Sequence, residues 1–208
     1  MTNQQEIFWS GKFGDKYTDR NVNVNDSTLE KFGVSRIQMN MDFLDGLKLN
    51  NILEVGCNRA EQLSLLKHKV KVDLYGIDIN DYALCEAREY NPELNLIKGS
   101  ALDIPFKDNY FDLVFTSGVL IHIHPDNLKQ VMSEIYRCSK EYILGFEYHS
   151  FWCQEITYRG NKGFLWKNDF KQLYLDTFPD LELVKETFYR YKDNSGCVDN
   201  MFLLKKKS

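Results

Sequence analysis

The 208-residue sequence predicts one α/β domain, residues 1–208, built on a doubly wound, seven-stranded and mainly parallel sheet. Short apolar runs of strand type recur along the chain, and segments with helical apolar spacing separate most of them. Right-handed crossovers place such helices on both faces of a parallel sheet. The length of the chain also fits one domain better than two.

The expected elements begin after an aromatic-rich opening segment, residues 1–26. A helix is expected over residues 27–47, where Phe32, Ile37, Met41 and Leu44 give helical rather than alternating spacing. The alternating core follows, with strands at 51–55, 74–77, 95–98, 111–116 and 142–147 and helices at 61–68, 81–90 and 125–138.

The last third of the chain departs from this rhythm. Residues 149–168 are rich in aromatic and charged side chains, and we expect a substrate-side insertion there. A helix at 169–177 and strands at 183–191 and 201–204 complete the domain. The turn residues 193–196 join these two strands, so the last strands are expected to be antiparallel.

The composition argues against several classes of protein. With 26 basic and 30 acidic residues the net charge is −4, so the sequence disfavours a nucleic-acid partner. No apolar stretch approaches the roughly 20 residues of a membrane span, and the polar start does not resemble a signal peptide. We therefore expect a cytoplasmic protein without a membrane partner. The five cysteines form no CxxC pair and no zinc-like cluster, so no metal site is expected.

Polar residues at the ends of the first two strands indicate a nucleoside pocket. Gly56 allows a sharp turn after the first strand, and Asp78 at the end of the second suits the hydroxyl groups of a ribose. Asn58 and Ala60 stand where a dinucleotide-binding loop has glycines, and Glu54 disfavours a pyrophosphate. A ligand with a ribose, no phosphate and a positive amino-acid portion is S-adenosylmethionine.

Four segments resemble the motifs of the class I S-adenosylmethionine-dependent methyltransferases. They are ILEVGC at 52–57, GIDI at 76–79, GSALDIPF at 99–106 and FDLVFTSGVL at 111–120. These motifs occur in the order that the family has, and the resemblance implies a Rossmann-like fold.

A narrower resemblance covers nearly the whole chain. The segments FWSGKFGDKYTDRN at 8–21, GVLIHIHPD at 118–126, YILGFEY at 142–148 and YRGN at 158–161 are similar to the pseudaminic acid biosynthesis-associated methylases. That family is associated with nine-carbon sugars of bacterial surface glycans. The resemblance implies a seven-stranded sheet with one antiparallel strand.

The resemblance implies S-adenosylmethionine as the cofactor and S-adenosylhomocysteine as its product. The residues it places around this cofactor are Glu54 and Gly56 at the methionine end, Asp78 at the ribose, Ile79 at an adenine face, and Ser100, Ala101 and Leu102 at the adenine edge. Further residues expected on the pocket wall are Asn58, Thr116, Ser117 and Gly118. Asp78 could instead be a turn carboxylate, and Ile79 and Leu102 could instead belong to the core.

The opening aromatic segment, residues 1–26, could fold over the cofactor as a lid. Trp9, Phe13 or Tyr17 would then contact the positive sulfur, and Arg20 would bind a carboxylate. Trp9 is also a candidate contact for the substrate. The alternative is that these aromatic side chains pack on the core.

Methyl transfer depends mainly on alignment of the acceptor with the methyl group. If the acceptor is an amine or a hydroxyl, a base must take its proton. His122, just after the fourth strand, is the first candidate, and Glu147 and Tyr148 are the others. The alternative for His122 is a structural or hydrogen-bonding role.

The insertion carries two candidate substrate contacts, Tyr158 and Arg159. Arg159 would suit the carboxylate of an acidic sugar through a bidentate pair. The alternative is a surface arginine that pairs with Glu155.

These observations together lead to the hypothesis of an enzyme that methylates an oxygen or nitrogen of a small polar acceptor, a nonulosonic (pseudaminic-type) sugar or its precursor. The alternatives are another small molecule, a tRNA, or a non-catalytic member that binds the cofactor without turnover. The sequence does not predict the oligomeric state.

Overall fold

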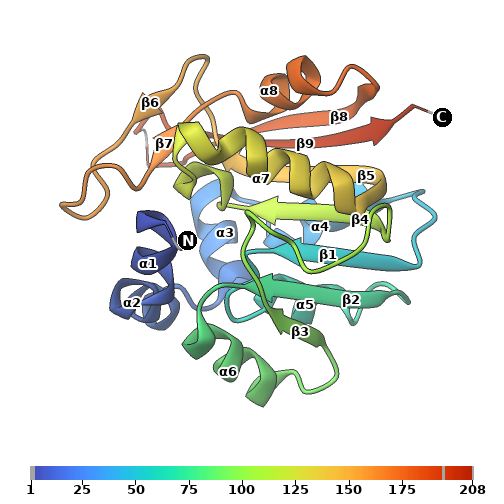
Figure 1. Ribbon diagram of the computed structural model, residues 1–208, viewed down its shortest axis with the longest axis horizontal. Coiled ribbons are helices and arrows are strands. Elements are labelled where there is room, and N and C mark those ends of the chain that lie inside the picture. The colour runs from blue at the N-terminus through green and yellow to red at the C-terminus, as the bar shows by residue number, and fades with distance from the viewer. Residues whose placement is uncertain (1–2, 194, 208) are drawn as a thin grey trace.

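The computed structural model describes residues 3–193 and 195–207. Residues 1 and 2 of the expected lid, Asn194 of the expected turn, and Ser208 lie outside the described residues. The centre is a seven-stranded sheet in the order β3-β2-β1-β4-β5-β9-β8 (Figure 1). The strands are β1 (Asn51–Val55), β2 (Asp73–Asp78), β3 (Asn95–Lys98), β4 (Phe111–Ser117), β5 (Ser139–Tyr148), β8 (Leu181–Arg190) and β9 (Val198–Lys206).

The pairing of the strands confirms the expected fold class. The five strands β1 to β5 pair in parallel, and β9 is antiparallel to both β5 and β8. The winding direction reverses between β1 and β4, because β2 and β3 lie on one side of β1 and β4 and β5 on the other.

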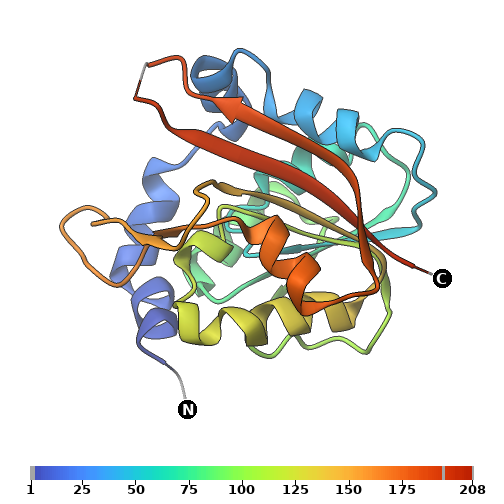
Figure 2. The same cartoon turned by 90° about the horizontal axis from the view of Figure 1, so that it is seen from above.

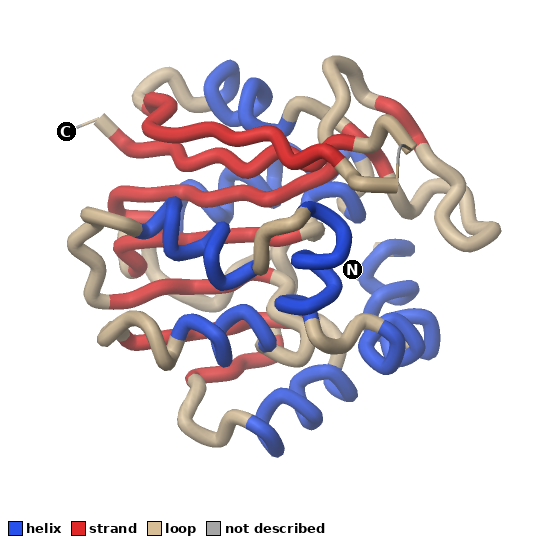
Figure 3. Tube along the Cα trace, turned by 180° about the vertical axis from the view of Figure 1, so that it is seen from behind, coloured by secondary structure: helices blue, strands red, loops and turns tan. Residues whose placement is uncertain are grey.

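Helices cover both faces of the sheet, as Figures 2 and 3 show. One apolar cluster joins the sheet to α4 (Arg36–Leu44), α5 (Glu61–Leu66) and α6 (Asp81–Tyr90). The other joins it to α7 (Pro125–Cys138) and α8 (Phe170–Thr177). Burial on both faces explains why the central strands β1, β4, β5 and β9 read as mostly apolar runs, whereas β3 and β8 at the edges are largely exposed.

The expectation of one helix over residues 27–47 is wrong. Two helices stand in its place, α3 (Val24–Phe32) and α4. Gly33 ends α3 in the left-handed region, with a φ of 83°, and the Ser35 side chain accepts an N–H of the first turn of α4. Phe32 and Ile37, on either side of this break, lie five residues apart and so fall on different sides of an ideal helix, and the prediction of one helix did not take this shift into account.

Two peripheral segments lie beyond the carboxyl ends of the parallel strands (Figure 1). The first consists of α1 (Gln4–Ser10) and α2 (Lys12–Arg20). The second includes the short antiparallel pair β6 (Gln154–Glu155) and β7 (Trp166–Lys167). Within the described ranges, no helix has both the length and the apolar character needed to cross a membrane.

Candidate functional site

A cavity of about 400 Å³ opens at the carboxyl ends of β1, β2, β3 and β4, beneath the helices α1 to α3. This is the place where the winding of the sheet reverses, which is the usual ligand site of doubly wound folds. The sequence-predicted residues that line it are Trp9, Tyr17, Arg20, Glu54, Gly56, Asn58, Asp78, Ile79, Ser100, Ala101, Leu102, Ser117, Gly118, His122, Tyr148 and Tyr158.

The loop after β1 follows a strained path without its usual glycines. Gly56 has a φ of 73°, and a Cβ there would lie 2.5 Å from a methyl carbon of Val119. Asn58 and Ala60 also adopt left-handed conformations, with φ values of 47° and 56°. Asparagine tolerates this region, whereas alanine does so at a cost of about 1–2 kcal/mol. The backbone of the loop therefore adopts left-handed conformations that glycine usually occupies, even though Asn58 and Ala60 carry side chains.

Asp78 joins the loops after β1 and β2. Its Oδ2 accepts the N–H of Asn58 at 2.8 Å, and its Oδ1 accepts the N–H of Asn80 at 2.9 Å. Loss of solvent raises the pKa of Asp78, although these hydrogen bonds act in the opposite direction. The carboxylate is thus a turn acceptor that also lines the cavity, and its contact with a ribose stays a prediction.

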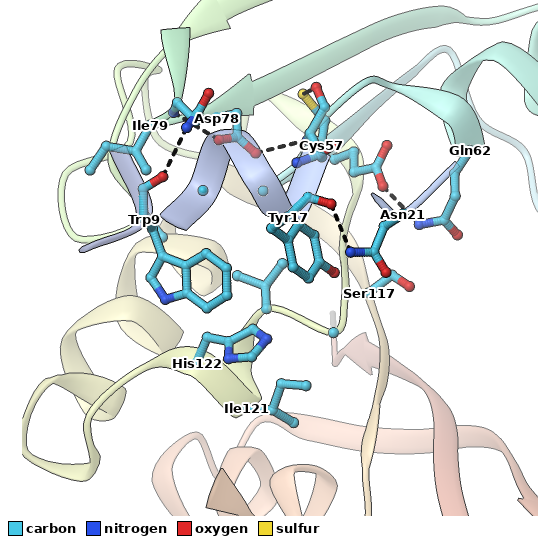
Figure 4. Close-up of a pocket in the computed structure, with 18 of the residues that line it drawn as sticks. Trp9, Tyr17, Asn21, Cys57, Gln62, Asp78, Ile79, Ser117, Ile121 and His122 are labelled. Atoms are coloured by element: carbon cyan, nitrogen blue, oxygen red, sulfur yellow. Dashed lines mark hydrogen bonds between the residues drawn. The ribbon is translucent and has the colours of Figure 1, made fainter. Parts of the chain in front are cut away.

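The same two asparagines hold the N-terminal helices over the cavity. Asn80 Nδ2 donates to the carbonyl oxygen of Trp9 at 3.0 Å, and Asn58 Nδ2 donates to Oγ1 of Thr18 at 2.9 Å. Figure 4 shows the first of these bonds next to Asp78. The backbone of each asparagine binds Asp78, so α1, α2 and both loops belong to one network.

Two buried ionic groups near the end of β1 retain unused hydrogen-bonding capacity. Glu54 Oε1 accepts from Gln62 at 2.8 Å, but its Oε2 has no partner among the described residues. Burial raises the pKa of Glu54 well above its usual value. Arg36 is 5% exposed and lines the cavity, and its Nε and Nη1 have no partner in the described chain.

The guanidinium carbon of Arg36 lies 3.8 Å from the centre of the Phe146 ring. Among the described residues, no carboxylate forms an ion pair with Arg36 within 4.0 Å. Burial lowers the pKa of Arg36 to about 10, so the group stays charged at neutral pH. The sequence reading missed Arg36, because no motif marks one arginine at the start of a helix.

An aromatic cluster forms the opposite wall. The ring centre of His122 lies 4.3 Å from that of Trp9 and 5.3 Å from that of Tyr158, and Tyr17 stands edge-on to Trp9 at 5.3 Å (Figure 4). His122 Nδ1 lies 2.8 Å from the carbonyl oxygen of Phe164. A carbonyl can only accept, so Nδ1 carries the proton and Nε2 remains an acceptor. Burial lowers the pKa of His122 to about 4, and the ring is neutral at pH 7.

The second arginine of the cavity also has free donors. Arg20 Nε and Nη2 are buried without a partner in the described chain, and so is Nε1 of Trp9. The guanidinium carbon of Arg20 lies 5.1 Å from the ring centre of Phe13 and 5.4 Å from that of Tyr17. Stacking orients the guanidinium group, and its unpaired nitrogens can bind an anion.

Four sequence-predicted residues are not among those that line the cavity, namely Phe13, Thr116, Glu147 and Arg159. Glu147 accepts the N–H groups of Val119 and Ile121 at 3.2 and 3.3 Å, and it also binds Thr116. Burial raises the pKa of Glu147 to about 7. Glu147 and Thr116 therefore shape the loop after β4 from behind, and Glu147 is not in place to take a proton from an acceptor.

Arg159 is exposed, with a φ of 48°, and is not among the residues that line the cavity. Glu155 Oε1 accepts the N–H of Gly163 at 2.7 Å, and no ion pair of Arg159 occurs among the described residues. The described part of the chain also contains no cluster of three or more residues able to hold a metal ion.

Residues 53–142 match a family model described as a methyltransferase domain. The 24-methylenesterol C-methyltransferase 2 of Arabidopsis thaliana is 29% identical over 109 residues, which cover 50% of this chain and 30% of that relative. A demethylmenaquinone methyltransferase of Listeria welshimeri is 33% identical over 100 residues, which cover 45% of this chain and 42% of that protein. The chain thus spans less than half the length of these curated relatives.

A similar fold occurs in 1,6-didemethyltoxoflavin-N1-methyltransferase of Burkholderia thailandensis, which was solved with 1,6-didemethyltoxoflavin and S-adenosylhomocysteine bound. The TM-score is 0.65 at 13% identity, and the match covers 83% of this chain and 76% of that chain. At this identity the likeness shows the fold alone, which is the Rossmann-like fold of class I methyltransferases.

Proposed function

We propose that this chain is a class I S-adenosylmethionine-dependent methyltransferase that transfers the methyl group to an oxygen or nitrogen of a small polar acceptor, and the match of residues 53–142 to a methyltransferase domain supports this. One observation carries the proposal. A single cavity at the reversal point of the sheet contains two acids, Glu54 and Asp78, and a neutral histidine, His122, whose Nε2 can accept a proton.

The residues of the cavity fit S-adenosylmethionine. Asp78 has lone pairs left for ribose hydroxyls, and Glu54 Oε2 is an orphaned acceptor beside which a cationic amino group would favour the ionised carboxylate. Arg20 offers unpaired donors to the carboxylate of the methionine portion. When bound, S-adenosylmethionine supplies a methyl group already activated by its positive sulfur.

His122 has the properties of a general base. Its Nε2 is free to accept, its Nδ1–H is fixed on the carbonyl of Phe164, and its pKa of about 4 keeps it neutral. A proton taken from an acceptor hydroxyl or amine would rest on Nε2. The rings of Trp9 and Tyr158 pack against the imidazole and fix its place in the cavity wall. The low pKa also makes His122 a weak base, so alignment supplies the larger part of the rate.

The unpaired guanidinium groups favour an anionic acceptor. Arg20 and Arg36 both line the cavity with unpaired nitrogens, whereas S-adenosylmethionine has only one carboxylate to bind. A buried donor that stays unpaired costs about 1–3 kcal/mol, so the second arginine favours a second anionic group. If Arg20 binds the cofactor, Arg36 remains for a carboxylate on the acceptor. A nonulosonic acid of the pseudaminic type, or its precursor, has both this carboxylate and the hydroxyl and amine groups that could be methylated.

A methyl-transfer assay tests this proposal. The protein is incubated with S-adenosylmethionine carrying a labelled methyl group and with pseudaminic acid, N-acetylneuraminic acid or their methyl esters. We expect labelling of at least one acid and at least tenfold less labelling of its ester, because the ester lacks the charge that Arg36 would bind.

Two variants separate the parts of the proposal. His122→Gln should lower kcat at least tenfold with little change in the affinity for S-adenosylhomocysteine. Arg36→Met should reduce the preference for the acid over its ester. Labelling of a tRNA or of an uncharged small molecule in place of every acidic sugar would contradict the anionic acceptor. Cofactor binding without any turnover would point to a non-catalytic member.

A further inference from the structure

The adenine end of the cavity has a carboxylate that comes from α1. Glu6 lines the cavity beside Ser100, whose hydroxyl donates to Glu6 Oε1 at 2.6 Å. Glu6 Oε2 accepts the N–H of Asn3 at 2.9 Å, and the N–H of Glu6 donates to Asn3 Oδ1 at 2.9 Å. A carboxylate has about four acceptor positions in all. Glu6 therefore keeps capacity for another donor.

The loop after β3 supplies no acid of its own to this end of the cavity. Ser100 lines the wall there, whereas Asp103 is exposed and is not among the lining residues. The other acids that line the cavity within the described chain are Glu54 of β1, Glu61 of α5, Asp78 of β2 and Asp199 of β9, so they come from other elements. Glu6 is thus the carboxylate beside the loop where we place the adenine edge.

The position of α1 is fixed relative to the expected ribose site. The side chains of Asn58 and Asn80 bind α2 and the end of α1, and their backbone N–H groups bind Asp78. A nucleoside whose ribose contacts Asp78 therefore meets Glu6 at a set place. The amino group of adenine is a donor that loses water in such a pocket and needs an acceptor there.

We propose that Glu6 accepts a hydrogen bond from the 6-amino group of the adenine, so that the N-terminal helices select adenosyl over inosyl ligands. This inference rests on the proposed function, because it takes the cavity to bind S-adenosylmethionine. Inosine has a 6-oxo group in place of the amine. Two acceptors would then face each other, and Glu6 would disfavour the ligand.

Calorimetric titration with S-adenosylhomocysteine and S-inosylhomocysteine tests the inference. The wild type is expected to bind the adenosyl compound at least tenfold more tightly, which is typical for a hydrogen bond to a charged group. Glu6→Gln should bring the two affinities within about threefold of each other. The amide can accept from the 6-amino group and can also donate to the 6-oxo group.

The Glu6→Gln variant is suited to this test because glutamine also serves at the third helical position of a capping box. Asn3→Ala is the matched control. It breaks the same capping box but leaves the carboxylate in place, so it should lower the helix content of α1 while the adenosyl-to-inosyl affinity ratio stays as in the wild type. Circular dichroism of both variants checks that the fold is intact.

The outcomes distinguish this inference from the proposed function. Equal affinity of the wild type for the two compounds, or an unchanged ratio in Glu6→Gln, overturns the role of Glu6 and leaves the methyltransferase proposal standing. Failure of the wild type to bind either compound overturns the proposed function and this inference with it.

Discussion

His122 is held in a single protonation state by its surroundings. The carbonyl of Phe164 fixes the proton on Nδ1, and burial lowers the pKa to about 4. In the unfolded chain the neutral ring takes up a second proton near pH 6.5. Burial of this ring therefore weakens the folded state progressively as the pH falls from about 6.5 to about 4, and it has no such effect above pH 6.5.

We expect the ring of His122 to stay neutral down to about pH 5, where a solvent-exposed histidine is mostly charged. The measurement is an NMR titration of the ring nitrogens in protein labelled with ¹⁵N at histidine, with His122→Gln used to assign the signal. The spectrum should show the tautomer protonated at Nδ1. A midpoint near 6.5, or a proton on Nε2, would contradict the role of His122 as an acceptor in the cavity.

The sequence predicted those site residues that follow directly from strand ends. Gly56 and Asp78 end the first two strands, and the fold brings such ends together at one edge of the sheet. Glu6 and Arg36 could not be found in this way, because they come from helices whose docking depends on tertiary contacts. Arg159 was placed in a plausible segment, but the backbone carries it to the surface.

The helices α1 and α2 dock through close backbone contact at Gly14. A Cβ on this residue would lie 1.8 Å from the carbonyl oxygen of Trp9 and 2.7 Å from Nδ2 of Asn80. The space is taken by the same groups that hydrogen-bond the helices to the loop after β2. Gly14 therefore allows the docking that positions both Trp9 and Glu6.

We expect Gly14→Ala to lower the stability of the protein by about 1–3 kcal/mol, the usual cost of overpacking. A loss of stability would be informative, because alanine in the middle of a helix is otherwise more favourable than glycine by roughly 0.5–1 kcal/mol. Denaturant unfolding measures the change, and Ser10→Ala, at an exposed position of α1, is the control. A variant as stable as the wild type would mean that α1 and α2 do not dock as described.

The boundaries of elements were less predictable than their existence. The alternation of strands and helices was sufficient to predict the sheet, but the prediction missed the break at Gly33. Phe32 and Ile37 lie five residues apart, which departs from the spacing of one helical face, and the capping of α4 by Ser35 depends on a local hydrogen bond. A glycine between two apolar residues is compatible with either one helix or two.

The arrangement of the sheet brings all parts of the site together. The reversal of winding between β1 and β4 leaves a gap at the carboxyl edge, where the loops after four strands and the N-terminal helices meet. Within this cavity, Glu54 and Asp78 lie at the ends of β1 and β2, and His122 follows β4. Cofactor and acceptor would thus lie on neighbouring strand ends, which is the alignment that methyl transfer requires.

The most direct test of this account is calorimetric titration of S-adenosylhomocysteine into the wild type, Asp78→Asn and Asp73→Asn. Asp73 begins the same strand at its opposite, exposed end and serves as the matched control. The wild type and Asp73→Asn are expected to bind alike, and Asp78→Asn at least tenfold more weakly, because a charged acceptor for the ribose is lost. Absence of binding in the wild type, or equal affinity in Asp78→Asn, would contradict an adenosyl site at the ends of β1 and β2.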